Sequence, residues 1–235
     1  MQPERAKTRR FIQAIGYRNQ FMEQFMASPL KAYRDELGAK LHQLLGADWR
    51  FYKSRMTFIK KDICGEQEIT LDSVAKFSPW VDFSLYFSRN FTLAPEALQA
   101  VGIESISIRQ NSHNRAHMKG LPFSGGGRGT WPISIRQPVP AGLPEELMRF
   151  IKSTILPFFD MFLTPEAWRD DLAQGRFSDG WGRKKSEYWR ELLVLDLHLH
   201  DAEHFNKWML ENKLPHEFCQ EASQIIENWK KSLKV

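Results

Sequence analysis

Three histidines and two carboxylates stand close together near the C-terminus, at His198, His200, Asp201, Glu203 and His204. On a continuous helix, His200 and His204 would share one face, which is the geometry that lets two imidazoles hold one metal ion. The string H-D-A-E-H differs from the zinc-hydrolase pattern H-E-x-x-H, because Asp201 stands where that pattern has a longer glutamate. A metal-dependent hydrolase using His198, His200 and His204 is the alternative hypothesis. We favour a polar helix face, or a turn between two helices at residues 200–202, with solvated histidines in either case, since no further ligand stands at a suitable spacing.

Carboxylates also gather on the segments with helical patterns in the last third of the chain. Paired carboxylates can do acid–base chemistry, but near helix ends they often complement the helix dipole or are simply solvated. We interpret them as acidic faces that contact a partner protein. The expected contact residues are Asp160, Glu166, Asp170, Asp171, Asp196, Asp201 and Glu203.

The remaining motifs do not form a catalytic set. Residues 124–129 read S-G-G-G-R-G, but they lack the Lys-Ser or Lys-Thr pair of a phosphate-binding P-loop and lead into a strand pattern. The sequence contains no G-x-S-x-G elbow, and Cys64 and Cys219 have no partner histidine at a diagnostic spacing. The sequence therefore predicts no catalytic residue and no cofactor.

Positive charge is concentrated in the first quarter of the chain. Residues 1–61 carry 13 Lys and Arg against 5 Asp and Glu, although the net charge of the whole chain is only +5. A nucleic-acid-binding protein that uses this basic segment is a third hypothesis. We favour a solvated basic tail, and nucleic acid is not the partner that we expect.

A second segment combines aromatic side chains with cations, at Trp181, Tyr188 and Trp189. Such a face can stack on bases. We favour core aromatics flanked by solvated cations, because Glu187 and Glu191 alternate with those cations and would repel a phosphate backbone.

Period-two alternation of apolar residues, which marks half-buried strands, dominates the middle of the chain. It is clearest at Val81, Phe83, Leu85 and Phe87. The expected strands cover residues 49–59 with a bulge near 54–55, then 68–76, 81–88, 105–110 and 131–136. Because they follow one another through turns, they indicate an antiparallel meander of four or five strands.

Helical patterns lie on both sides of this sheet in the sequence. Ser28 is expected to cap a helix that ends at Gly46 and covers one face of the sheet. Pro157 should kink or end a later helix, and Thr164 should cap another that ends at Gly175. The expected helices cover residues 8–26, 29–45, 143–157, 165–175, 184–199, 203–211 and 215–233. The order helices, sheet, helices predicts an α+β fold.

Bulk composition bounds the class of protein. The 235 residues are 42% hydrophobic, with 17 Phe and 8 Trp, which suits one folded domain made of a helical part (1–46), a sheet (47–140) and a helical layer (141–235). No apolar run reaches the ~18 residues of a membrane span, and no signal-peptide core follows the basic start. We expect a cytoplasmic protein with no membrane partner, in which both cysteines are reduced and buried.

Four segments between residues 41 and 173 carry a family resemblance. They are L-L-G at 44–46, F-Y-K-S-R-M-T-F-I-K-K at 51–61, F-S-L-Y-F at 83–87 and I-L-P-F-F-D-M-F at 155–162. With them the chain resembles an uncharacterised bacterial α+β family of immunity-type proteins, which are often encoded beside polymorphic toxins. The resemblance implies a non-enzymatic protein that binds and neutralises a cognate toxin. A basic toxin such as a nuclease would suit the acidic helices.

Overall fold

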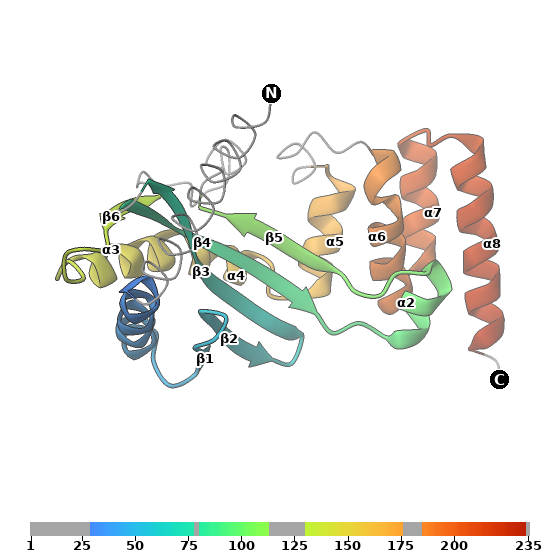
Figure 1. Ribbon diagram of the computed structural model, residues 1–235. Helices are drawn as coiled ribbons and strands as arrows, with labels where there is room; N and C mark the ends of the chain where they lie inside the picture. Colours follow the sequence, from blue (N-terminus) through green and yellow to red (C-terminus); the bar gives the residue numbers. More distant parts are fainter. Residues whose placement is uncertain (1–28, 78–79, 113–129, 176–184, 234–235) are drawn as a thin grey trace, which may run out of the picture.

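A computed structural model describes residues 29–77, 80–112, 130–175 and 185–233 of the chain, and the helix expected over residues 8–26 lies outside these ranges. The order is a helix, a sheet and a layer of helices, which confirms the α+β prediction (Figure 1). The described elements are helix 29–45, β1 (Arg50–Tyr52), β2 (Thr57–Asp62), β3 (Gly65–Phe77), β4 (Trp80–Phe91), α2 (Pro95–Val101), β5 (Ser107–Asn111), β6 (Trp131–Ser134), α3 (Leu143–Phe150), η1 (Ile151–Ile155), α4 (Leu156–Met161), α5 (Pro165–Ala173), α6 (Lys185–His198), α7 (Ala202–Glu211) and α8 (His216–Ser232).

The strands form an antiparallel meander in the order β1-β2-β3-β4-β5, and β6 pairs with β4 as a sixth strand. Strands β5 and β6 lie on the same edge of β4, because β5 pairs with residues 86–90 and β6 with residues 80–83. The meander is confirmed, with six strands where four or five were expected. The prediction of one bulged strand over residues 49–59 is wrong, because a turn at residues 53–56 divides this segment into the β1–β2 hairpin.

One face of the sheet carries the hydrophobic core. Phe83 and Phe87 lie on the same face of β4, since they are separated by an even number of residues. Tyr33 of helix 29–45 stacks on Phe83, with ring centroids 5.8 Å apart. Phe158 of α4 meets Phe87 edge to face at 5.0 Å. The helix before the sheet and a helix after it therefore cover this one face, as expected for the first of them.

Pro157 lies inside a continuous run of helix rather than at its end. The helix widens into a π-helical turn, η1, just before Pro157 at the start of α4. A proline has no N–H to donate and its ring crowds the preceding turn, and a π-turn is a known way to relieve such a mismatch. The kink expected at Pro157 thus takes the form of a local change in helix type.

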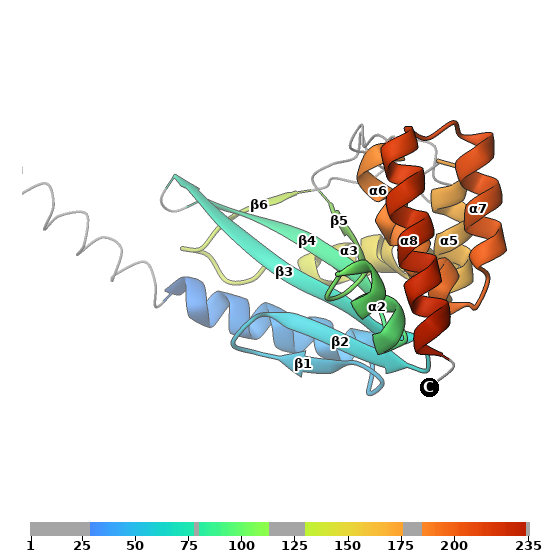
Figure 2. The ribbon, with the colours of Figure 1, turned by 90° about the vertical axis from the view of Figure 1, so that its right-hand side faces the viewer.

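The C-terminal helices lie beyond the end of the sheet, and α2 joins the two parts (Figure 2). Helix α2 follows β4 directly and contacts both α6 and α8. This helix was not expected from the sequence. No helix in the described ranges is both long and apolar enough to cross a membrane. Cys64 and Cys219 are unbridged as expected, but both are partly exposed rather than buried.

Gly38 sets how closely helix 29–45 approaches the β1–β2 hairpin. A Cβ at this position would lie 2.5 Å from Cζ of Phe51 and 2.6 Å from Cε of Met56. We expect Gly38→Val to lower the free energy of unfolding by about 2 kcal/mol, because the added atoms must displace packed side chains. The matched control is Ala39→Val at the exposed neighbouring position, which should cost about 0.5 kcal/mol through helix propensity alone. Urea denaturation measures both, and equal losses would contradict the prediction.

Candidate functional site

The three histidines of the sequence cluster occupy separate environments. Helix α6 ends at His198, and His200 lies in the following turn with φ of 55°. His204 belongs to α7, so a break between two helices is present, but it covers residues 199–201 rather than 200–202, and His200 and His204 do not share a continuous helix. Only His200 is exposed, so the expectation of solvated histidines is wrong for His198 and His204, which are half-buried. His198 Nδ1 accepts a hydrogen bond from the Ala94 N–H at 3.0 Å. The His200 ring packs against Trp229, with centroids 5.5 Å apart.

A metal site would require these imidazoles to converge on one point. The hydrogen bond of His198 to Ala94 and the packing of His200 on Trp229 instead direct the two rings to different partners. Burial lowers the pKa of His198 and so favours its neutral form, which suits its role as an acceptor. Over the four described ranges, no three His, Cys, Asp or Glu side chains are placed to hold one metal ion.

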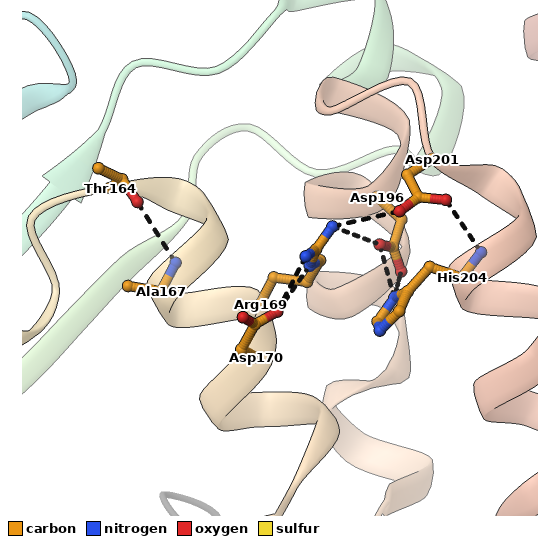
Figure 3. A network of polar contacts seen from close by, with 7 residues as sticks. All are labelled: Thr164, Ala167, Arg169, Asp170, Asp196, Asp201 and His204. Atoms are coloured by element: carbon orange, nitrogen blue, oxygen red, sulfur yellow. Dashed lines mark hydrogen bonds and ion pairs between the residues drawn. The ribbon is translucent and has the colours of Figure 1, made fainter.

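His204 instead takes part in a polar network that joins helices α5, α6 and α7 (Figure 3). Its Nδ1 lies 2.8 and 3.1 Å from the two carboxylate oxygens of Asp196. Arg169 of α5 reaches Asp201 at 3.4 Å and Asp196 at 3.9 Å, and it also pairs with Asp170 at 2.9 Å. Asp201 caps α7, because its side chain accepts from the His204 N–H at 3.2 Å.

Asp196 is the centre of this network and has no exposed surface. Burial raises the pKa of its carboxyl to about 6, although the hydrogen bond to His204 and the charge of Arg169 oppose that rise. A carboxylate bound to Nδ1 fixes the orientation of an imidazole, which is how a histidine base is held in many enzymes. Within the described residues, however, the opposite ring nitrogen Nε2 of His204 bonds no hydroxyl or thiol that could act as a nucleophile. The network therefore joins three helices.

The acidic residues expected to contact a partner are divided between the surface and the interior. Asp171 and Asp196 are buried, at 5% and 0% exposure, so neither presents a carboxylate to another protein. Asp170 and Asp201 reach the surface but pair with Arg169. The exposed carboxylates that form no ion pair with a described residue are Asp160, Glu166 and Glu203.

Arg89 is a buried cation that the sequence analysis missed. Its side chain is 0% exposed, and Nη2 donates to Oδ1 of Asp62 at 2.8 Å. The same nitrogen donates to the carbonyl of Leu163 at 2.9 Å, and Nε donates to the carbonyl of Phe162 at 3.2 Å. The guanidinium thus ties the turn between β2 and β3 to the connection between α4 and α5. Its place on the inward face of β4, after Phe87, is the signal that was available in the sequence.

This tie joins two segments that each carry an exposed apolar residue. Ile63, beside Asp62, is 99% exposed at the tip of the β2–β3 turn. Leu163 is 48% exposed, and its carbonyl bonds the guanidinium nitrogen that also bonds Asp62. Asp160 and Glu166, which form no ion pair with a described residue, stand three residues before and after Leu163 in the sequence. We call Ile63, Leu163, Asp160 and Glu166 the tip patch.

The glycine-rich segment and the aromatic segment noted in the sequence lie wholly or partly outside the described ranges. The glycine-rich residues 124–129 and Trp181 lie outside the described ranges. Tyr188 and Trp189 are buried, at 1% and 3% exposure, and Arg190 pairs with Glu221. This part of the aromatic segment is therefore core with a solvated cation beside it, as favoured.

Comparisons of the chain with protein families, with curated proteins and with solved structures return no match. The resemblance to immunity-type proteins consequently stays a prediction.

Proposed function

We propose that this protein is a non-enzymatic binding factor that docks through its tip patch onto a basic surface of another protein. The observation that carries the proposal is Ile63, a large apolar side chain that is 99% exposed at the tip of a hairpin turn. Turn positions favour Gly, Asn, Asp and Ser, and an exposed apolar side chain there contributes nothing to the fold. Arg89 ties the segment that carries exposed Leu163 to this turn, so in this proposal the two apolar residues anchor one interface together.

The charges around this centre indicate the sign of the partner surface. Asp160 and Glu166 flank Leu163 and form no ion pair with a described residue. An apolar centre with a charged rim is the usual organisation of a protein interface, and complementary charge speeds encounter. A partner with Lys and Arg around an apolar recess fits this patch.

The tip patch is also held in a fixed geometry before any partner arrives. Arg89 bonds both segments that carry the patch, and Asp62 Oδ1 additionally accepts from the Cys64 N–H at 2.9 Å. Because the turn is ordered in the free protein, little conformational entropy is lost when it docks.

The resemblance to immunity-type proteins identifies the first partner to test, the product of the gene next to this one. In this proposal the protein binds that product, a basic toxin, and neutralises it. Expression of the neighbouring product with and without this protein would measure the neutralisation directly.

We expect Ile63→Asp to weaken binding of that product by roughly 30-fold, because truncating or charging an interface anchor costs about 2 kcal/mol. Leu163→Asp should act in the same direction, and isothermal titration calorimetry measures both. The matched control is Leu210→Asp on α7, since Leu210 is a large apolar residue that is 80% exposed and lies outside the tip patch. The proposal fails if the neighbouring product does not bind, or if Leu210→Asp weakens binding as much as Ile63→Asp.

A further inference from the structure

A groove of about 600 Å³ lies between helix 29–45 and the turn at residues 53–56. The described residues that line it are Lys31, Arg34, Asp35, Lys53, Ser54 and Met56. Its volume is within the range of sites for small organic ligands. The groove and the tip patch are separate, because the turns at residues 53–56 and 63–64 stand at opposite ends of β2.

The charge in this groove is not balanced by the residues that line it. Lys53 pairs with Asp35, with Nζ and Oδ2 3.1 Å apart. Lys31 and Arg34 form no ion pair with any residue in the described part of the chain. Within the described residues, two cations of this groove thus have no carboxylate paired with them.

Arg34 adds a more specific observation. Its Nε is shielded from solvent and has no hydrogen-bond acceptor among the described residues. A shielded donor without an acceptor is costly, and such groups in folded proteins often mark a place where another molecule supplies the missing atom. An anionic oxygen next to Nε would satisfy the donor and neutralise the guanidinium together.

The turn at residues 53–56, which contributes to the lining, is held firmly. Met56 is 1% exposed and its backbone has φ of 54°, a left-handed conformation that residues other than glycine rarely adopt. Its N–H donates to the Lys53 carbonyl at 3.3 Å, which closes the turn. A backbone held in this conformation positions Lys53 and Ser54 at the edge of the groove.

We propose that this groove binds a small organic anion, with Arg34 and Lys31 on the anionic group and the turn at residues 53–56 beside the rest of the ligand. Lys53 and Asp35 neutralise each other, and the Asp35 carboxylate can also accept from a hydroxyl or amine of the ligand. A phosphate monoester and a carboxylate both supply the oxygens that a guanidinium binds with two parallel bonds.

Titration calorimetry of the full chain with AMP and with citrate tests the site and distinguishes the two sources of anion. We expect one of them to bind with Kd below about 1 mM. Arg34→Gln should weaken that binding by about tenfold or more, since it removes a charge-assisted hydrogen bond. The control is Arg55→Gln, because Arg55 lies over the Tyr52 ring and does not line the groove; this change should alter Kd less than about twofold.

Several results would overturn the proposal. Absence of binding by both AMP and citrate up to several times that concentration is one, and equal weakening by Arg34→Gln and Arg55→Gln is another. A third is binding of oligo-dT alone, with affinity that falls steeply as salt rises, which would indicate a nucleic-acid surface instead. Thermal unfolding of each variant verifies that it is folded before titration.

Discussion

Replacing Arg89 with methionine is expected to lower the free energy of unfolding by about 3–5 kcal/mol, because it breaks an ion pair whose cation is fully buried and takes a donor away from three acceptors. The guanidinium is 0% exposed and bonds Asp62 and the carbonyls of Phe162 and Leu163. Methionine has a similar length but no N–H, so three acceptors lose their bonds at once. Since a domain of this kind is stable by only about 5–15 kcal/mol, the variant should unfold at a much lower urea concentration.

The matched control is Arg109→Met on the adjacent strand β5, where the arginine is exposed; it should change stability by about 0.5 kcal/mol or less. The pH dependence gives a second readout. Burial alone would raise the pKa of Asp62, but hydrogen bonds from Arg89 and the Cys64 N–H outweigh it and lower that pKa. Stability from this pair is therefore complete above the ordinary carboxyl pKa of 3.8 and is lost as pH falls through the lowered value. A loss no larger than that of Arg109→Met would contradict the assignment.

The sheet could be predicted well where alternation carried the signal, and poorly where a turn lacked its usual residues. Strand β4 alternates strictly from Val81 to Phe87, and its inward row continues into Arg89. The sequence could show that Arg89 faces the core. It could not show the acceptors, because the Phe162 carbonyl stands 73 residues later in the chain.

The β1–β2 hairpin shows why one turn escaped prediction. A turn is normally recognised by Gly, Asn or Pro, whereas residues 53–56 read K-S-R-M, with Met56 in the left-handed region. The Met56 side chain packs against Gly38 of the preceding helix. A contact between residues so far apart in the chain leaves no pattern in the sequence near the turn. Helix α2 is a different case, because Pro95 at its start and Gly102 at its end, with φ of 73°, were available signals.

For the histidine cluster, the decisive signal was the cap rather than the spacing. Asp201 precedes A-E-H as an N-cap would, and His200 adopts φ of 55°, so the helix restarts between His200 and His204. The pairing of His204 with Asp196, on the preceding helix, required the geometry of three packed helices. Only part of the tip patch was predicted from the sequence. Asp160 and Glu166 were expected to contact a partner, whereas Ile63 was not.

The Asp196–His204 pair makes the second strong prediction, which is that His204→Leu destabilises the protein in a pH-dependent way. The change removes the hydrogen bond to a carboxylate that has no exposed surface, and it leaves Arg169 at 3.9 Å as the nearest cation. At pH 8 the carboxylate is ionised, and we expect a loss of about 3 kcal/mol. At pH 5 the loss should fall to about 1 kcal/mol, because a protonated Asp196 no longer carries a buried charge.

The sign follows from the pKa of Asp196, which burial raises from 3.8 to about 6. The folded chain holds this proton more tightly than the unfolded chain, so the contribution to stability is greatest below pH 3.8 and declines as pH rises through about 6. Without His204 that pKa should rise further, and the decline should move to higher pH. The double variant Asp196→Leu/His204→Leu removes the charge together with its partner, and it should regain most of the loss at pH 8 because two apolar side chains replace the pair. Equal losses for His204→Leu at both pH values, or no recovery in the double variant, would show that the buried carboxylate is not the source of the effect.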